Sequence, residues 1–261
     1  HDILCPMNTP LNFSIEIAKE AGNILMKYYR ATGIQANKKA DKSAVTEGDL
    51  AADEFLRCKI QQAYPQDGLI SEEAGTVYPK GKSAVWVIDP LDGTTNFSLG
   101  LHHWGVAINR IIDGLPELTA LYFPIIDELF TAQRGAGAFL NGERIQVKIP
   151  DENQPFSFFS CCTRTIRNYN INLRYKTRVL GTSAYGLSTV ARGNAVLAFE
   201  TTPKIWDFAG SWLLTEEAGG IIRVLDGSTP FPLVPGTDYK TKSYPILAAA
   251  TPELWTEGQQ N

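Results

Sequence analysis

The chain has 261 residues, which is enough for one large domain or two small ones with a substantial core. Its 24 Lys and Arg against 28 Asp and Glu give a net charge of −4, so nothing in the charge balance favours nucleic acid or an anionic membrane as a partner. No apolar run approaches the roughly 18 residues that a membrane-spanning helix needs, and the four cysteines include no C-x-x-C pair. We therefore expect a soluble cytoplasmic protein that binds neither nucleic acid nor membrane.

Apolar positions at helical spacing predict helices over residues 11–29 and 46–64, with a polar loop at 34–44 between them. Three strand-like pieces follow, and the turn residues between them predict an antiparallel meander. The pieces are 105–112, 118–123 and 129–132. The C-terminal part alternates expected strands with expected helices. The strands are 156–160, 178–180, 195–199, 221–224 and 245–250, and the helices are 183–191 and 208–218.

This alternation predicts a layered α/β (α+β) architecture. The favoured internal boundary lies near residues 147–155. It would divide the chain into an N-terminal α+β half, 8–147, and a C-terminal α/β half, 148–261.

The most informative stretch runs from Trp86 to Asn96, where an apolar strand ends in Asp89 and Asp92 and continues as Gly93-Thr94-Thr95. Carboxylates at the end of a strand can hold a hard cation, and a Gly/Thr loop can offer backbone N–H groups to an anion. Asp-Pro and Asp-Gly are also ordinary turn dipeptides, but the threonines and asparagine that follow favour a metal and phosphate site.

Three further acidic positions each have a structural explanation when taken alone. Glu72-Glu73 could be a solvated surface pair. Asp49 stands at capping-box spacing after Thr46, and Asp207 precedes an apolar helix that it could cap.

Together these pieces resemble the inositol monophosphatase family. The resemblance rests on Glu72-Glu73, the stretch Asp89-Pro90-Leu91-Asp92-Gly93-Thr94-Thr95-Asn96, and Trp206-Asp207-Phe208-Ala209-Gly210 followed by Glu217-Ala218-Gly219-Gly220. It extends over residues 13–250. The resemblance implies a lithium-sensitive, Mg²⁺-dependent phosphatase related to fructose-1,6-bisphosphatase, with an α/β/α/β/α sandwich fold and a homodimeric state.

The resemblance also implies a ligand set. Glu72, Asp89 and the backbone carbonyl of Leu91 would bind one Mg²⁺; Asp89, Asp92 and Asp207 would bind a second, and Glu72 with waters would assist a third. An all-oxygen donor set independently favours Mg²⁺ over zinc, which prefers His or Cys.

For catalysis, the resemblance makes Thr94 and Asp49 the pair that orients a metal-activated water toward the ester, with Glu72 assisting. No covalent phosphoenzyme is needed. The N–H groups of Gly93 and Thr94, at an expected helix start, would hold the phosphate.

Substrate selection would fall to the C-terminal half. Gly181, Thr182 and Ser183 match a family loop whose backbone meets substrate hydroxyls, and Glu200 matches a glutamate that binds inositol hydroxyls, although it could simply end a strand at solvent. Lys38 aligns with a lysine on a loop beside the metals, but the surrounding sequence departs from the family and a solvated charge cluster is an equal alternative.

Two other groups have mainly structural interpretations. For His102-His103 we expect a packing or surface role. Five basic residues without an acid occupy the stretch 164–178, for which we favour a solvated or dimer-facing surface over binding of a second phosphate. They are Arg164, Arg167, Arg174, Lys176 and Arg178.

The sequence thus predicts a Mg²⁺-dependent phosphomonoesterase for a small phosphorylated metabolite, with inositol 1-phosphate as the leading substrate. Histidinol phosphate, fructose 1,6-bisphosphate and 3'-phosphoadenosine 5'-phosphate are alternatives. Because some bacterial relatives act in transcription complexes, a binding protein of such a complex is the alternative of another class. The full set of catalytic matches favours the enzyme.

Overall fold

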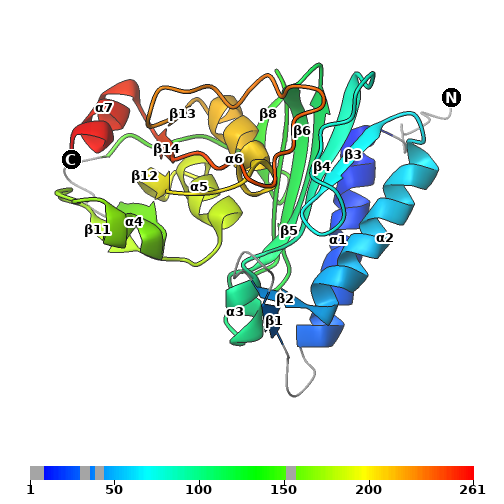
Figure 1. Ribbon diagram of the computed structural model, residues 1–261. Helices are drawn as coiled ribbons and strands as arrows, with labels where there is room; N and C mark the ends of the chain where they lie inside the picture. The colour runs from blue at the N-terminus through cyan, green and yellow to red at the C-terminus, as the bar shows by residue number, and fades with distance from the viewer. Residues whose placement is uncertain (1–8, 30–35, 39–43, 151–156) are drawn as a thin grey trace, which may run out of the picture.

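Five layers build the protein, as a computed structural model shows for residues 9–29, 36–38, 44–150 and 157–261, with backbone alone at 36–38 and 44–45. Helices α1 (Pro10–Tyr29) and α2 (Glu47–Ala63) form the first layer, and a seven-stranded sheet the second. Helices α5 (Ser183–Ala191) and α6 (Ile205–Glu217) lie between this sheet and a five-stranded one, beyond which lie α4 (Thr163–Asn168) and α7 (Pro252–Gln260) (Figure 1). The predicted α/β/α/β/α sandwich is confirmed.

The seven-stranded sheet has the order β3-β4-β5-β6-β7-β8-β9. Its strands are β3 (Gly68–Ser71), β4 (Ala84–Asp92), β5 (Gly105–Ile112), β6 (Leu115–Phe123), β7 (Glu128–Gln133), β8 (Gly137–Leu140) and β9 (Glu143–Ile145). Strands β5, β6 and β7 pair antiparallel, as the predicted meander requires, whereas β3 and β4 are parallel. The parallel pair brings the C-terminal ends of β3 and β4 to the same edge of the sheet.

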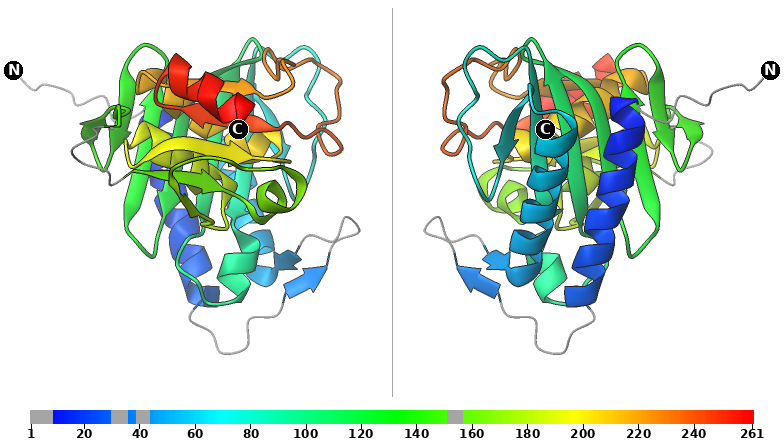
Figure 2. Two further views of the ribbon diagram at one scale, coloured as in Figure 1. Left: turned by 90° about the vertical axis from the view of Figure 1, so that its left-hand side faces the viewer. Right: turned by 90° about the vertical axis from the view of Figure 1, so that its right-hand side faces the viewer.

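Helices α1 and α2 cover the outer face of this sheet (Figure 2). Their apolar sides supply Leu25 and Leu56, which are fully buried in one cluster with Trp86 and Ile88 of β4. All nine residues of β4 are buried, including its two aspartates. A carboxylate held in such a strand needs a partner of opposite charge or hydrogen-bond donors.

The five-stranded sheet has the order β11-β10-β12-β14-β13. Its strands are β10 (Phe158–Cys161), β11 (Lys176–Arg178), β12 (Ala195–Glu200), β13 (Ile221–Val224) and β14 (Ile246–Ala249). Strand β10 is parallel to both β11 and β12, while β14 is antiparallel to β12 and β13. The strand expected at 178–180 lies earlier, as β11, because Gly181 follows with a positive φ of 79° and turns the chain toward α5.

Helix α6 packs very closely on the large sheet. A Cβ on Gly210 would lie 2.5 Å from Thr119 Oγ1 and 2.6 Å from Asn109 Oδ1, so the glycine permits this approach. The close packing fixes the N-terminus of α6, and with it Asp207, against the ends of β3 and β4.

Short elements account for the remaining differences from the sequence prediction. A two-stranded sheet of β1 (Ala36–Lys38) and β2 (Ala44–Thr46) lies where a polar loop is expected, and β3, β8, β9, α4 and α7 are not predicted. Within the described part of the chain, no helix combines the length and apolar character needed to cross a membrane.

Candidate active site

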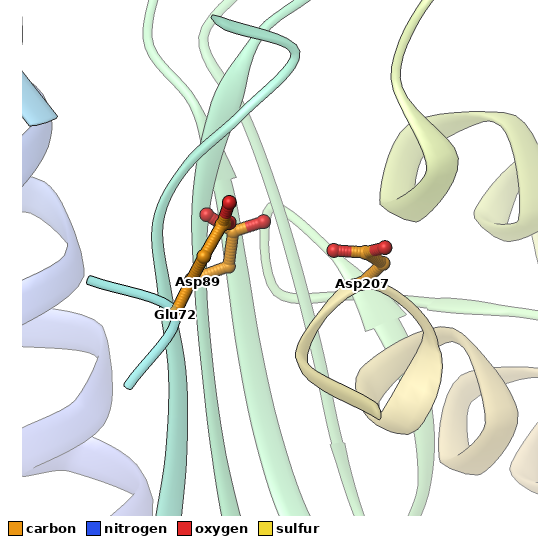
Figure 3. Close-up of side chains that lie close together, drawn as sticks. All are labelled: Glu72, Asp89 and Asp207. Carbon is orange, nitrogen blue, oxygen red and sulfur yellow. The ribbon is translucent and has the colours of Figure 1, made fainter. Parts of the chain in front are cut away.

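Three carboxylates meet where the two halves of the chain touch. Glu72 follows β3 directly, Asp89 lies near the end of β4, and Asp207 is the third residue of α6. Each offers one oxygen, and the three oxygens lie within 4.8 Å of one another. Figure 3 shows Glu72 and Asp89 side by side on one flank, with the carboxylate of Asp207 facing them from the other. The fold therefore builds an acidic group that could hold a metal ion.

Burial and mutual repulsion make this arrangement costly without a cation. Asp89 is 2% exposed, and burial, then the nearby Glu72, Asp207 and Asp92, raise its pKa well above the ordinary value. Burial, Glu72 and Asp92 likewise raise the pKa of Asp207. A divalent cation bound by these oxygens would remove the repulsion, and an all-carboxylate donor set suits a hard ion such as Mg²⁺.

Asp207 does not cap α6 as an N-cap residue. Lys204 occupies the N-cap position, and its backbone N–H donates to Asp207 Oδ2 at 2.7 Å. The expected capping residue is therefore at the third helical position, from which one oxygen satisfies the helix start.

Asp92 is not part of this group of three and forms its hydrogen bonds with the N-terminus of α5. Its carboxylate accepts hydrogen bonds from Thr182 Oγ1, from the N–H of Ser183 at 3.2 Å and from the N–H of Ala184 at 3.0 Å. Burial raises its pKa to about 6 although these hydrogen bonds lower it. Of the backbone N–H groups expected to meet substrate hydroxyls, that of Ser183 is thus bound to Asp92.

Leu91 joins the two aspartates to the next turn. Its N–H donates to Asp89 Oδ1 at 2.9 Å, and its carbonyl accepts from Thr94 Oγ1 at 3.1 Å. The pairing of β4 with β5 shifts register between Asp89 and Asp92, which lets both side chains leave the ladder at the strand end.

The two oxygens of Asp49 have different partners. Oδ2 accepts from the N–H of Thr46 at 2.8 Å and from its hydroxyl at 2.5 Å, forming the predicted capping box of α2. Oδ1 lies 3.3 Å from the hydroxyl of Thr94. Capping therefore holds Asp49, which is 2% exposed, in contact with Thr94.

Gly93 begins the short helix α3 (Thr94–Ser98), as the sequence predicts for the phosphate loop. Its φ of 89° suits glycine, and a Cβ would lie 3.0 Å from the carbonyl of His103. Asn96 closes this turn, because its Nδ2 donates to the carbonyls of His103 at 2.6 Å and Leu180 at 2.7 Å. The second bond crosses between the two halves of the chain.

A cleft of about 770 Å³ opens beside these groups. Asp92 and Asp207 line it, as do Gly181, Thr182, Ser183 and Glu200 from the expected substrate elements. Glu200 is 6% exposed and accepts from Ser183 Oγ at 3.3 Å. Burial, followed by Cys162 and Asp92, raises its pKa well above normal. The strand end is thus buried in the cleft wall, not solvated.

The histidines and part of the basic stretch also reach the cleft. His102 and His103 line it, and the ring of His103 packs on Tyr185 with centroids 5.1 Å apart, in keeping with a packing role. Arg164 and Arg167 line it too. The side chain of Lys38 lies outside the described residues.

Sequence reasoning missed two supporting side chains. Asp53 of α2 is buried, accepts from Ser71 Oγ and pairs with Arg57 Nε at 2.7 Å. It thereby holds the end of β3 immediately before Glu72. Asp53 follows Asp49 by one helical turn on the same face of the helix, and this spacing could have identified it from the sequence. Asn96 belongs to the motif that begins at Asp89, but one of its two acceptors, Leu180, lies 84 residues further along the chain.

The chain is similar to proteins of one known family over almost its whole length. The model of the inositol monophosphatase family matches residues 7–258. The chain is 35% identical to the Nus factor SuhB of Pasteurella multocida, over 96% of this chain and 94% of that protein. It is 34% identical to a histidinol-phosphatase of Chlorobaculum parvum, over 82% and 85%.

A solved structure of an IMPase also resembles this fold. The IMPase of Thermotoga maritima superposes with a TM-score of 0.79 at 25% identity, covering 96% of this chain and 95% of that one. With its acidic group and layered fold, the chain belongs to the inositol monophosphatase family.

Proposed function

We propose that the protein is a Mg²⁺-dependent phosphomonoesterase that hydrolyses the phosphate ester of a small polyol. The observation that carries this proposal is the group Glu72, Asp89 and Asp207, whose oxygens lie within 4.8 Å beside a polar cleft. Two or three Mg²⁺ would be held by these residues with Asp92 and the Leu91 carbonyl. Bound there, Mg²⁺ would polarise the phosphoryl group and lower the pKa of a water molecule.

The residues of the chain supply orientation. Asp49 is fixed by its cap to Thr46, and its second oxygen and the Leu91 carbonyl both lie within reach of the single hydroxyl proton of Thr94. With the Leu91 carbonyl bound to Mg²⁺, that proton would go to Asp49. In this proposal the hydroxyl of Thr94 orients the attacking water toward phosphorus, and Asp49 accepts the proton that the water loses. The N–H groups of Gly93 and Thr94 hold the phosphate oxygens.

Selection of the polyol would fall to Glu200 and Ser183. Their side chains lie 3.3 Å apart in the cleft wall and together offer acceptors and a donor to substrate hydroxyls. Inositol 1-phosphate is the leading substrate, and histidinol phosphate follows because a relative at 34% identity is named histidinol-phosphatase.

A phosphate-release assay tests this proposal. It would compare inositol 1-phosphate, histidinol phosphate, fructose 1,6-bisphosphate and 3'-phosphoadenosine 5'-phosphate, each with Mg²⁺ and with EDTA. We expect release only with Mg²⁺. Glu200→Gln should lower kcat/KM for inositol 1-phosphate by about 1 to 3 kcal/mol in transition-state stabilisation, since a charge-assisted hydrogen bond becomes a neutral one. Release that is unchanged in EDTA would disprove metal dependence.

Lithium gives an independent test that rests on the family alone. We expect Li⁺ to inhibit by occupying a Mg²⁺ site, whereas Na⁺ at matched ionic strength should not. Equal inhibition by both ions would indicate screening instead. We also propose that the protein is a cytoplasmic homodimer. Light scattering would test the oligomeric state.

A second candidate function follows from another relative. The Pasteurella multocida protein, 35% identical over nearly the whole chain, is named a Nus factor, so a binding role in a transcription complex is the alternative. Pull-down from lysate beside the phosphatase assay separates the two: retention of transcription proteins without turnover of any ester would favour binding.

A further inference from the structure

Two arginines reach the candidate active site from a basic stretch that the reaction does not use. Arg164 and Arg167 stand three residues apart on α4, which places them on one side of the helix. Both line the cleft that also contains Glu200 and Asp207. Arg178, from the same stretch, is exposed and lies outside the lining. Arg164 and Arg167 are exposed as well, in agreement with the surface interpretation favoured from the sequence, but unlike Arg178 they also line the cleft.

Arg164 is held in place on the wall of the cleft. One of its terminal nitrogens donates to Thr202 Oγ1 at 2.7 Å, and Thr202 also lines the cleft. Thr202 stands two residues after Glu200, at the end of the same strand. The guanidinium is thus fixed next to the segment that is expected to bind substrate hydroxyls, with its other N–H groups still able to donate.

Neither arginine has an acidic partner in the described part of the chain. The ion pairs there involve Arg57, Lys59, Arg110, Arg134 and Arg192. A planar guanidinium is suited to bidentate binding of phosphate or carboxylate. Two of them, unpaired and facing one cleft, form a site for an anion.

The size of the cleft leaves room for such an anion beyond the ester. Its volume of about 770 Å³ lies in the upper part of the roughly 300–1,000 Å³ typical of small-molecule pockets. Asp207 of the acidic group lines the same cleft as Arg164 and Arg167. A substrate whose ester lies at Asp207 would place its second acidic group at the two guanidinium groups.

We propose that Arg164 and Arg167 form a second anion subsite, so that the preferred substrate is a phosphate ester carrying another acidic group on the part of the molecule remote from the ester. This inference rests on the proposed phosphatase function and narrows its substrate class. An ester without the second group, such as inositol 1-phosphate, is hydrolysed less efficiently. The second group is a phosphate or a carboxylate, the two anions that a guanidinium fork binds in the same way.

One sugar scaffold tests the subsite and identifies the anion. Glucose 1-phosphate, glucuronic acid 1-phosphate and glucose 1,6-bisphosphate differ at carbon 6, which carries a hydroxyl, a carboxylate or a phosphate. The kcat/KM of each would be measured with Mg²⁺ at about 0.15 M ionic strength, where distant charges are screened, and ³¹P NMR would identify the phosphate released. The proteins are wild type, Arg164→Gln, Arg167→Gln, the double variant and Arg178→Gln, the matched control.

We expect wild type to prefer at least one acidic ester over glucose 1-phosphate by about tenfold, as a charge-assisted hydrogen bond predicts. The double variant should lose this preference and keep its activity on glucose 1-phosphate, and Arg178→Gln should behave as wild type. Whichever acidic ester is favoured identifies the anion.

Three results would overturn the subsite: no preference in wild type, a preference that survives in the double variant, or an equal fall for all three esters. The last would mean that the arginines only offset the acids of the cleft. If none of the three glucose esters is hydrolysed, the phosphate-release assay with inositol 1-phosphate and the other candidate substrates still decides the phosphatase proposal separately. Calorimetric titration of the same ligands then still decides the subsite, because tighter binding of an acidic ester by wild type than by the double variant supports it and equal binding overturns it.

Discussion

The carboxylate of Asp49 shows how a structural role and the proposed catalytic role can share one residue. One oxygen completes the capping box of α2, and the other contacts Thr94. Asp207 repeats the pattern, since it satisfies the start of α6 and also joins the acidic group. Because helix termini fix side chains in direction, a catalytic acid placed there is held without further support.

Substitution of Asp89 should separate metal binding from folding. Asp89→Asn removes one charge at the centre of the acidic group, so Mg²⁺-dependent phosphate release should fall by at least about a hundredfold. Calorimetry should show weaker Mg²⁺ binding, while circular dichroism stays unchanged.

The matched control is Glu73→Gln, which removes the same charge one residue from Glu72 and outside the acidic group. It should cost little activity. Near-normal Mg²⁺-dependent turnover in Asp89→Asn would refute the metal assignment.

Cys162 offers a chemical probe of the cleft. Burial alone would raise the pKa of its thiol, but hydrogen bonds with Thr165 and Thr201 outweigh this and lower it to about 7. Burial raises the pKa of its neighbour Cys161 to about 12. Since the thiolate is the nucleophile, iodoacetamide should alkylate Cys162 with a rate that rises through neutral pH, and leave Cys161 unmodified.

Mass spectrometry of the alkylated peptide measures both sites. Because Cys162 lines the cleft, inorganic phosphate with Mg²⁺ should protect it, and Cys162→Ser should abolish the label there. A Cys162 rate that is flat across about pH 6 to 8, or that phosphate leaves unchanged, would contradict this placement.

Among the elements, α3 and the start of α5 are joined by a single amide. Asn96 Nδ2 donates to His103 on one side and to Leu180 on the other. Asn96→Ala should leave both carbonyls without this donor and lower the free energy of unfolding by about 1 to 3 kcal/mol. It should also reduce kcat, because the phosphate turn and the Gly181 loop would lose their common support.

Ser98→Ala is the control from the same short helix, since its hydroxyl donates only to Thr94 within that helix, at 2.8 Å. We expect a loss below about 1 kcal/mol and near-normal kcat. Urea unfolding and steady-state kinetics measure both variants. Equal effects would show that Asn96 does not link the two halves.

Long helices and strands could be predicted from the sequence, whereas the short ones could not. Long apolar patterns predict α1, α5 and β5 closely, because burial of one face dictates their period. Helices α3 and α4 have five and six residues, too few to display a period. Short strands such as β1 and β9 depend on pairing with a neighbour, which local sequence does not encode.

At the scale of the whole molecule, the site exists only where the seven-stranded sheet meets the helices that lie between the two sheets. The motifs predict that Glu72, Asp89 and Asp207 act together, and the structure brings them together from β3, β4 and α6. The orientation of Asp92 toward α5 was not predictable, because it depends on where the N-terminus of a helix from the other half lies. The same holds for Arg164 and Arg167, which reach the cleft through the path of α4.

This concentration of acids should make the stability of the metal-free protein depend on pH. The pKa of Asp92 is raised to about 6, and those of Asp89, Asp207 and Glu200 are also raised well above their ordinary values, all chiefly by burial. Unfolded Asp and Glu titrate near about 4, so above that pH the folded state binds more protons than the unfolded state. The free energy of unfolding therefore falls as pH rises from about 4 through 6 and beyond.

In EDTA, Tm should thus be higher near about pH 5 than near about pH 7.5, and Mg²⁺ should raise Tm most at the higher pH, where the acids are charged. Burial lowers the pKa of His103, which tilts the profile the opposite way, so the informative quantity is the difference between wild type and Asp89→Asn. The variant lacks one repelling acid and should show a shallower decline and a smaller gain from Mg²⁺. Differential scanning fluorimetry across this range measures both, and identical profiles for the two proteins would show that Asp89 is not under electrostatic strain.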